Sequence, residues 1–123
     1  MSRKTFLSPD GRPCNQEPWG ALAAIDVATG KLRWDAPMTV SLGGPMTVNG
    51  VVFFGGTVFE TKLRAYAADD GRKLWEAELP FSAHSVPATY VWKDKRYVAV
   101  SAGGHGKVDG SKLGGEVMAF AVR

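Results

Sequence analysis

A histidine within a run of glycines is the residue whose setting best fits a ligand contact. His105 follows Gly103 and Gly104 and precedes Gly106. Glycines have no Cβ and let a backbone approach a bound molecule closely, while an imidazole can gain or lose a proton near neutral pH. The residue types leave a second interpretation open, in which His105 belongs to an exposed glycine-rich turn. We therefore take His105 as a candidate binding residue.

The remaining reactive side chains form no recognisable catalytic or metal-binding set. Cys14 is the single cysteine, so a disulfide within the chain is impossible. His84 precedes the strand expected after Pro87 without an identifiable partner, and Asp26 fits a turn-stabilising role better than that of a base. We assign no catalytic residue and no metal ligand from these residues.

The composition indicates one turn-rich, folded unit in which β-structure dominates. The chain has 123 residues, 45% of them hydrophobic, with 15 glycines and 7 prolines. Its net charge of +3 comes from scattered Lys and Arg residues, so a nucleic-acid interface is not expected. The sequence shows no apolar run of the ~18 residues that span a bilayer, and its first residues lack the ~7 to 15 apolar residues of a secretory signal.

A repeat places these residues on a series of similar sheets. The segments 22–34 and 63–75 resemble each other, and they carry Gly30 and Gly71, and then Trp34 and Trp75, at positions 41 residues apart. A period near 40 is typical of the blades of a β-propeller. Each segment is predicted to be a strand, a turn whose glycine accepts a positive φ, and a second strand. The two tryptophans are predicted to be buried between neighbouring blades.

Further hairpins are expected between and after the two repeats. Asn49-Gly50 lies between apolar runs and gives the strongest hairpin signal, and the charged segment 93–96 fits a solvated tip. The remaining expected strands are 45–48, 51–54, 88–92, 97–101 and 116–122. The prediction is an all-β chain of eight or nine antiparallel strands without a helix, forming a single partial propeller domain over 1–123. Its repeat units lie around 19–54 and 60–101, followed by a closing strand at 116–122. Four strands to a blade make about two to three blades.

The chain resembles the PQQ-dependent (pyrroloquinoline quinone) dehydrogenases, in the branch of the membrane-bound glucose dehydrogenases. The pattern Ala-x-Asp-x-x-Thr-Gly-Lys-x-x-Trp over 24–34 is similar to the tryptophan-docking repeat of that family. The other matching motifs, in order, are Pro-Cys-Asn-x-x-Pro-Trp-Gly at 13–20, Leu-Gly-Gly-Pro at 42–45, Leu-Pro at 79–80, Pro-Ala-Thr-Tyr at 87–90, Ala-Gly-Gly-His-Gly at 102–106 and Lys-Leu-Gly at 112–114. The resemblance covers nearly the whole chain and is to the C-terminal end of the family.

The resemblance implies an eight-bladed propeller that holds PQQ and Ca²⁺ on its axis. It implies oxidation of a sugar or polyol, with glucose as the model, and electron transfer to a quinone acceptor. The family's catalytic base and calcium ligands belong to earlier blades and are absent here, so we expect the isolated chain to be inactive. The periplasmic location is likewise implied by the resemblance alone.

The resemblance also gives roles to four residues. It implies that His105 lies near the substrate, and that Gly43 and Gly44 let backbone N–H groups meet the anionic cofactor. Turn geometry before Pro45 explains the two glycines equally well. Glu60 lies near the position of a family aspartate but is displaced by about one residue, and a solvated loop carboxylate is the alternative.

Two other functional classes remain open on the sequence alone. One is a non-catalytic propeller module that scaffolds an assembly in the bacterial envelope, and Gly43, Gly44 and His105 argue against it. The other is a small β domain that covers its open edges by self-association. Open strand edges and apolar blade faces predict that the isolated chain associates with itself unless the missing blades cover them.

Overall fold

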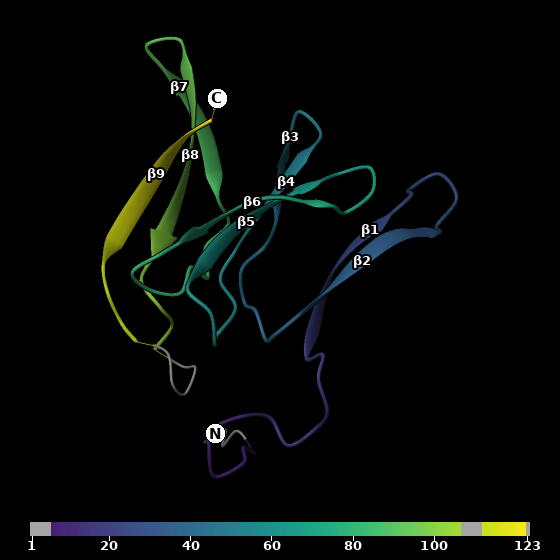
Figure 1. Ribbon diagram of the computed structural model, residues 1–123, viewed down its shortest axis with the longest axis vertical. Coiled ribbons are helices and arrows are strands. Elements are labelled where there is room, and N and C mark those ends of the chain that lie inside the picture. The colour runs from purple at the N-terminus through teal and green to yellow at the C-terminus, as the bar shows by residue number, and fades with distance from the viewer. Residues whose placement is uncertain (1–5, 107–111, 123) are drawn as a thin grey trace.

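The computed structural model describes residues 6–106 and 112–122, which form nine β-strands and no helix (Figure 1). The strands are β1 (Gly20–Ile25), β2 (Leu32–Met38), β3 (Met46–Val48), β4 (Val51–Gly55), β5 (Lys62–Ala67), β6 (Lys73–Glu78), β7 (Ala88–Trp92), β8 (Lys95–Ala102) and β9 (Glu116–Val122). The all-β prediction is confirmed. This part of the chain contains no helix with the length and apolarity needed to cross a membrane.

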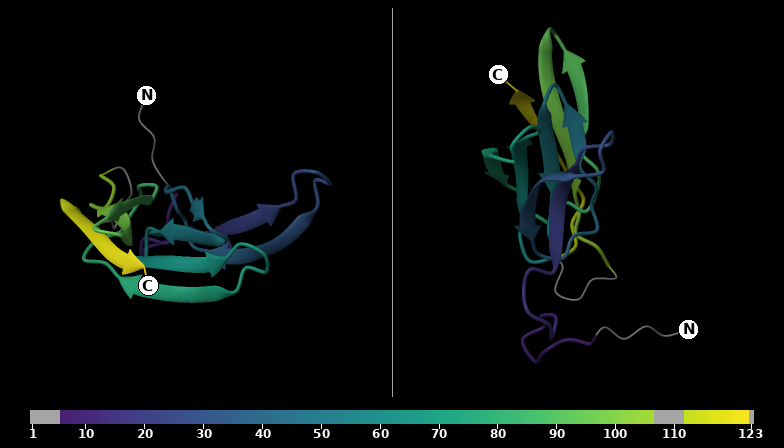
Figure 2. Two further views of the ribbon diagram at one scale, coloured as in Figure 1. Left: turned by 90° about the horizontal axis from the view of Figure 1, so that it is seen from above. Right: turned by 90° about the vertical axis from the view of Figure 1, so that its right-hand side faces the viewer.

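The strands form three antiparallel sheets that lie side by side (Figures 1 and 2). The first sheet is β1-β2, the second is β3-β4-β5-β6, and the third is β7-β8-β9. Within each sheet, strands that follow one another in the sequence pair with each other, as expected for consecutive hairpins. One four-stranded sheet therefore stands between two sheets with fewer described strands.

Glycine and asparagine shape the tight turns as the sequence predicted. Gly30 and Gly71 have φ of 69° and 74°, while Asn49 and Gly50 have φ of 47° and 74°. Two consecutive positive φ values are those of the hairpin turn that Asn-Gly favours. The turn between β7 and β8 is shorter than predicted: it consists of Lys93-Asp94, both with positive φ, so β8 begins directly after them at Lys95.

The strand registers show that β1-β2 corresponds to β5-β6. Ala24 pairs with Trp34 in the first sheet, and Ala65 pairs with Trp75 in the second. Both hairpins carry a register shift directly after that alanine. In the third sheet Ala119 of β9 pairs with a residue of β8, in the same way that Ala65 of β5 pairs with a residue of β4 in the second sheet. The third sheet therefore ends, within the described residues, at the strand equivalent to β5.

The sheets divide the chain at other places than the predicted repeat units. The units expected around 19–54 and 60–101 each combine strands of two sheets, whereas the complete four-stranded sheet runs from β3 to β6. The difference has a simple reason. The strongest sequence signal comes from the hairpin that ends in tryptophan, and this hairpin forms the last half of one sheet instead of the first half of a unit.

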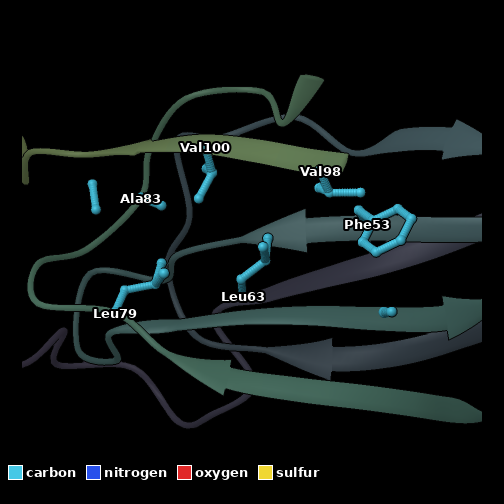
Figure 3. Packing of buried hydrophobic residues seen from close by; sticks show 8 residues of the cluster. Phe53, Leu63, Leu79, Ala83, Val98 and Val100 are labelled. Carbon is cyan, nitrogen blue, oxygen red and sulfur yellow. The ribbon is translucent and has the colours of Figure 1, made fainter. Parts of the chain in front are cut away.

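The middle sheet is packed on both faces because alternate residues of a strand point to opposite sides. Phe53 of β4 joins the cluster between the second and third sheets, whereas Val52 and Phe54 join the cluster between the first and second. Figure 3 shows Phe53, Leu63 and Leu79 facing Val98 and Val100 of the third sheet. Leu63 is fully buried at the centre of this packing. Two apolar layers therefore hold the three sheets together.

Trp34 connects the first sheet to the turn of the second. Its indole Nε1–H donates a hydrogen bond of 3.0 Å to the carbonyl oxygen of Ala68. A Cβ at Gly71 would lie 2.6 Å from Cδ2 of Trp34, so the ring rests directly on the glycine. Two features therefore require glycine at position 71: the positive φ of the backbone and the close approach of the Trp34 ring.

Trp75 is less enclosed than the sequence predicted. It contacts Phe120 of β9 edge to face, with ring centroids 5.1 Å apart, yet 38% of the residue is exposed. The prediction that both tryptophans are buried is therefore wrong for Trp75, and Trp34 is only partly buried. The described residues contain no turn after β9 that could cover it as the turn after β5 covers Trp34.

Candidate functional site

Every second connection between strands lies at the same end of the sheets. Hairpin turns close one end, and the connections 39–45, 56–61, 79–87 and the described parts of 103–115 lie at the other, lower in Figure 1. All four residues given a role by the sequence, Gly43, Gly44, Glu60 and His105, belong to these connections. Alternating antiparallel strands produce this arrangement without any special feature of the loops.

Gly43 and Gly44 let the connection before β3 pack against the connection before β7. A Cβ at Gly43 would lie 3.3 Å from the carbonyl carbon and oxygen of His84, and one at Gly44 would lie 3.1 Å from Cγ2 of Val86. The N–H of Gly43 donates to Oγ of Ser41 at 3.2 Å. Close packing of two loops therefore accounts for the missing side chains, and a cofactor role of Gly43 and Gly44 stays a prediction.

His105 lies next to a second histidine. The rings of His84 and His105 stand edge to face, with centroids 5.9 Å apart and planes 84° apart. They come from two different connections, the one before β7 and the one after β8. The structure therefore brings together Gly43, His84 and His105 at this end.

Backbone contacts fix the two connections that carry the histidines. The N–H of Gly104 donates to the carbonyl oxygen of Ser82 at 2.9 Å. The Oγ of Ser85 accepts a hydrogen bond from the N–H of Ser101 at 3.1 Å and donates one to its carbonyl oxygen at 3.2 Å. Each histidine thus lies close in the sequence to a residue that is bonded to the other segment, and this holds the rings side by side.

Burial favours the neutral form of His84. Removal of the ring from water lowers its pKa, and the nearby His105 lowers it further. Both ring nitrogens are buried and have no hydrogen-bond partner within the described part of the chain. The sequence assigned no role to His84, because nothing in the local pattern shows that 79–87 and 103–106 meet. The presence of a second histidine in the chain was the one feature that could have indicated this contact.

Glu60 belongs to a different cluster. Its carboxylate forms an ion pair of 2.7 Å with Arg64 and accepts a hydrogen bond from Oγ1 of Thr57 at 3.2 Å. It lines a cavity of about 480 Å³ between the first and second sheets, together with Tyr66 and Glu76 among others. No described contact joins Glu60 to His105 or Gly43, so its predicted cofactor role has no geometric support here and stays a prediction.

Glu76 is the centre of an ion-pair network on β5 and β6. Its carboxylate lies 2.7 Å from Nζ of Lys62, 3.0 Å from Nε of Arg64 and 3.2 Å from Nζ of Lys73. The hydrogen bond from Lys62, followed by those from Arg64 and Lys73, lowers the pKa of Glu76 to about 2. Because each oxygen of this carboxylate has a cationic partner, the network suits the packing of two strands better than proton transfer.

Residues 6–106 and 112–122 contain no recognisable set of side-chain metal ligands. The described His, Cys, Asp and Glu side chains form no group of three that could hold an ion. Ca²⁺ sites use carboxylates among their six to eight oxygen ligands, and no cluster of three acidic side chains is described in this part of the chain. What the loop end does offer is a pair of imidazoles, which can exchange hydrogen bonds with a neutral polar ligand.

Comparison with known proteins gives this arrangement a family. Residues 1–98 match the family model PQQ, described as "Glucose/ethanol/alcohol dehydrogenase, beta-propeller domain". The chain is 37% identical to the quinoprotein glucose dehydrogenase of Escherichia coli over 95% of its own length. It is 33% identical to the quinate/shikimate dehydrogenase (quinone) of Acinetobacter baylyi over 85%. The chain spans 17% and 16% of those two relatives.

A solved structure agrees with the arrangement of the strands. The quinohemoprotein alcohol dehydrogenase of Comamonas testosteroni superposes with a TM-score of 0.72 at 30% identity, covering 89% of this chain and 17% of that one. The three adjacent sheets are consequently part of a β-propeller, with one four-stranded blade and two blades of which fewer strands are described. On its matched family model and on its fold, the chain belongs to the β-propeller family of PQQ-dependent glucose, ethanol and alcohol dehydrogenases.

Proposed function

We propose that this chain contributes part of the substrate side of a PQQ-dependent dehydrogenase that oxidises a sugar or polyol. The observation that carries the proposal is the meeting of His105 with His84 beside Gly43 at the connection end of the blades. Relatives named for glucose, quinate and glycerol support a substrate with several hydroxyl groups. Transfer of the electrons to a quinone acceptor rests on the family resemblance.

The chemistry divides between the cofactor and the chain. Oxidation of an alcohol removes a hydride from carbon and a proton from oxygen, and bound PQQ supplies the two-electron acceptor for it. The imidazole of His105 can hold a substrate hydroxyl through a hydrogen bond and thereby orient the carbon that reacts. The family resemblance assigns the base that takes the hydroxyl proton to other blades, and this proposal follows it.

The direct test compares the isolated chain with the complete propeller. Given PQQ, Ca²⁺, glucose and an artificial electron acceptor, the isolated chain is expected to show no turnover above free PQQ, because the resemblance assigns the base and the calcium ligands of a quinoprotein site to blades outside this chain. Joined to the remaining blades, it is expected to regain turnover. Strong dehydrogenase activity of the isolated chain would contradict the division of labour proposed here.

His105 provides the matched variant. In the complete protein, H105A is expected to change sugar preference or lower kcat/KM by about tenfold or more, because a hydrogen bond to the substrate is lost. H105Q keeps a donor and an acceptor and is expected to lose less. An unchanged thermal midpoint separates this effect from unfolding. Equal kinetics of wild type and H105A on every sugar tested would remove His105 from the site.

The partners of the chain are proposed to be the remaining blades. Two features of the third sheet support this: the outer edge of β9 has no described partner strand, and a cavity of about 530 Å³ lies beside it, lined by apolar residues that include Trp75, Val98 and Phe120. A strand from the rest of the protein would cover both. A periplasmic location, beside a membrane quinone, belongs to the same proposal and rests on the resemblance.

Without those blades, the chain is expected to associate with itself. Exposed strand edges pair readily with other chains, and the apolar lining of the cavity beside Trp75 favours the same contact. We expect oligomers at micromolar concentration in sedimentation velocity, and binding of a hydrophobic dye. A monomer that binds no dye would mean that the open faces are already satisfied.

A further inference from the structure

His84 has hydrogen-bonding capacity that the described part of the chain does not use. Its Nδ1 and Nε2 are both buried, and neither has a partner among residues 6–106 and 112–122. Buried polar groups in native proteins nearly always have a partner in the protein, in an ordered water or in a ligand. Two unused nitrogens on one ring therefore point to a polar partner from outside these residues.

The position of His84 indicates where that partner enters. The ring faces His105, with 5.9 Å between the centroids, and the two rings come from different connections. Its backbone packs against Gly43, and the neighbouring Ser85 is bonded to Ser101 of β8, so the main chain is held from two sides. The contact between the rings is an edge-to-face pair, which does not satisfy the hydrogen-bonding capacity of the two buried nitrogens. In the site inferred below, a small polar group takes the place of this contact.

The charge state of His84 limits the chemistry of the ligand. Burial, and then the neighbouring His105, lower the pKa of His84, so its ring is neutral at neutral pH. A neutral imidazole offers one N–H donor and one nitrogen acceptor. A hydroxyl group also donates and accepts, so a polyol matches the ring. A carboxylate or a phosphate can only accept hydrogen bonds, so it would leave the acceptor nitrogen of the His84 ring without a partner.

We propose that His84 is a second ligand-recognition residue and that, with His105, it forms a two-imidazole site for neighbouring hydroxyl groups of a neutral polyol. The inference rests on the proposed function, to which it adds the residue that distinguishes substrates with several hydroxyl groups from simple alcohols. His84 binds the hydroxyl next to the one oxidised, and a substrate with a single hydroxyl does not engage it.

The test uses the complete PQQ-loaded protein with glucose, glycerol and ethanol as substrates. H84F keeps an aromatic ring and removes both nitrogens, H84Q keeps one donor and one acceptor, and Y90F is the control on an exposed strand. We expect H84F to lower kcat/KM by about tenfold or more for glucose and to change ethanol by less than about twofold. H84Q is expected to lie between wild type and H84F, and Y90F to match wild type.

Folding and chemistry are separated by a second measurement. H84F is expected to keep the thermal midpoint of the wild type or raise it, because it removes two unsatisfied buried groups. A loss of kcat/KM that is equal for glucose and ethanol would mean a structural role and would overturn the inference. Identical kinetics of H84F and wild type would overturn it as well.

The two proposals fail in different ways. If the wild-type protein oxidises none of the three substrates, the proposed function is wrong. The role of His84 is then tested by the binding of glucose and glycerol. Glucose and glycerol should still raise the thermal midpoint of the wild type more than that of H84F if the two imidazoles bind hydroxyl groups. Equal shifts in wild type and H84F would overturn the inference.

Discussion

Replacement of one glycine tests the contact that joins the first two blades. Gly71 has a φ of 74°, and a Cβ at this position would lie 2.6 Å from Cδ2 of Trp34. G71A therefore introduces both backbone strain and an overlap with a large ring. Gly30 occupies the equivalent turn of the first sheet with a φ of 69°, and a Cβ there would meet no described atom within 4 Å, so G30A introduces the strain alone.

The two substitutions are expected to differ by several-fold in free energy of unfolding. A left-handed backbone costs an alanine about 1 to 2 kcal/mol, and lower entropy of the unfolded chain offsets this by less than about 1 kcal/mol. We therefore expect about 1 kcal/mol for G30A. Displacement of Trp34 adds about 1 to 3 kcal/mol of overpacking, and loss of its hydrogen bond to Ala68 adds about 1 kcal/mol. G71A is expected to cost about 3 to 5 kcal/mol.

Urea unfolding at equal protein concentration measures both values, with circular dichroism as the signal. The decisive comparison is a double-mutant cycle with W34A. Once the indole is absent, a Cβ at Gly71 no longer displaces a ring, so G71A in the W34A background should cost no more than G30A in the wild type. The coupling energy between Gly71 and Trp34 is then about 2 kcal/mol or more.

The reasoning is refuted if G71A and G30A destabilise the chain equally. The ring of Trp34 would then move aside without loss, and the contact with the Gly71 turn would not hold the two sheets together. Additive effects of G71A and W34A would lead to the same conclusion, because independent sites show no coupling energy.

Two further predictions concern charge and packing. The pKa of Glu76 is lowered to about 2 from an ordinary value of 4.5, so its ion pairs stabilise the fold above about pH 4.5, and this contribution is lost as the pH falls toward 2. E76Q should therefore flatten the pH dependence of the urea midpoint between these two pH values. An unchanged pH dependence would refute the stabilising role of the network. W34A should cost about 3 to 5 kcal/mol, and W75A about 1 to 2 kcal/mol because Trp75 is 38% exposed, as urea unfolding can show; equal costs would contradict the different burial.

The strands were predictable from the sequence because local chemistry determines them. Asn49-Gly50 and the glycines of the repeat require positive φ, and the structure has it at each of them. The division into sheets was not predictable in the same way. The Asn49-Gly50 signal predicts that β3 pairs with β4, but it does not show that a sheet begins at β3, a strand of three residues. Repeat detection aligns the tryptophan hairpins instead, and these hairpins lie at the ends of sheets.

The candidate site was predictable in part. His105 could be selected from its glycine-rich setting, since that feature lies within five residues. The partnership of His84 with His105 depends on how two connections about 20 residues apart in the sequence meet, and no local pattern records it. Glu60 shows the reverse case. Its place in the sequence predicts a cofactor contact, which stays a prediction, and the structure adds an ion pair with Arg64, four residues later, that the sequence did not predict.

The incomplete third sheet and the histidine pair are linked through β9. His105 lies in the connection between β8 and β9, so its position depends on the pairing of β9 with β8. Among the described strands, β9 lies at the edge of its sheet, whereas β5, the equivalent strand of the second sheet, lies between β4 and β6. A fourth strand beside β9 would cover the edge, enclose Trp75 and restrain the connection that carries His105. Under the proposed function, we therefore expect completion of the blade to act on substrate recognition through the position of the His105 ring.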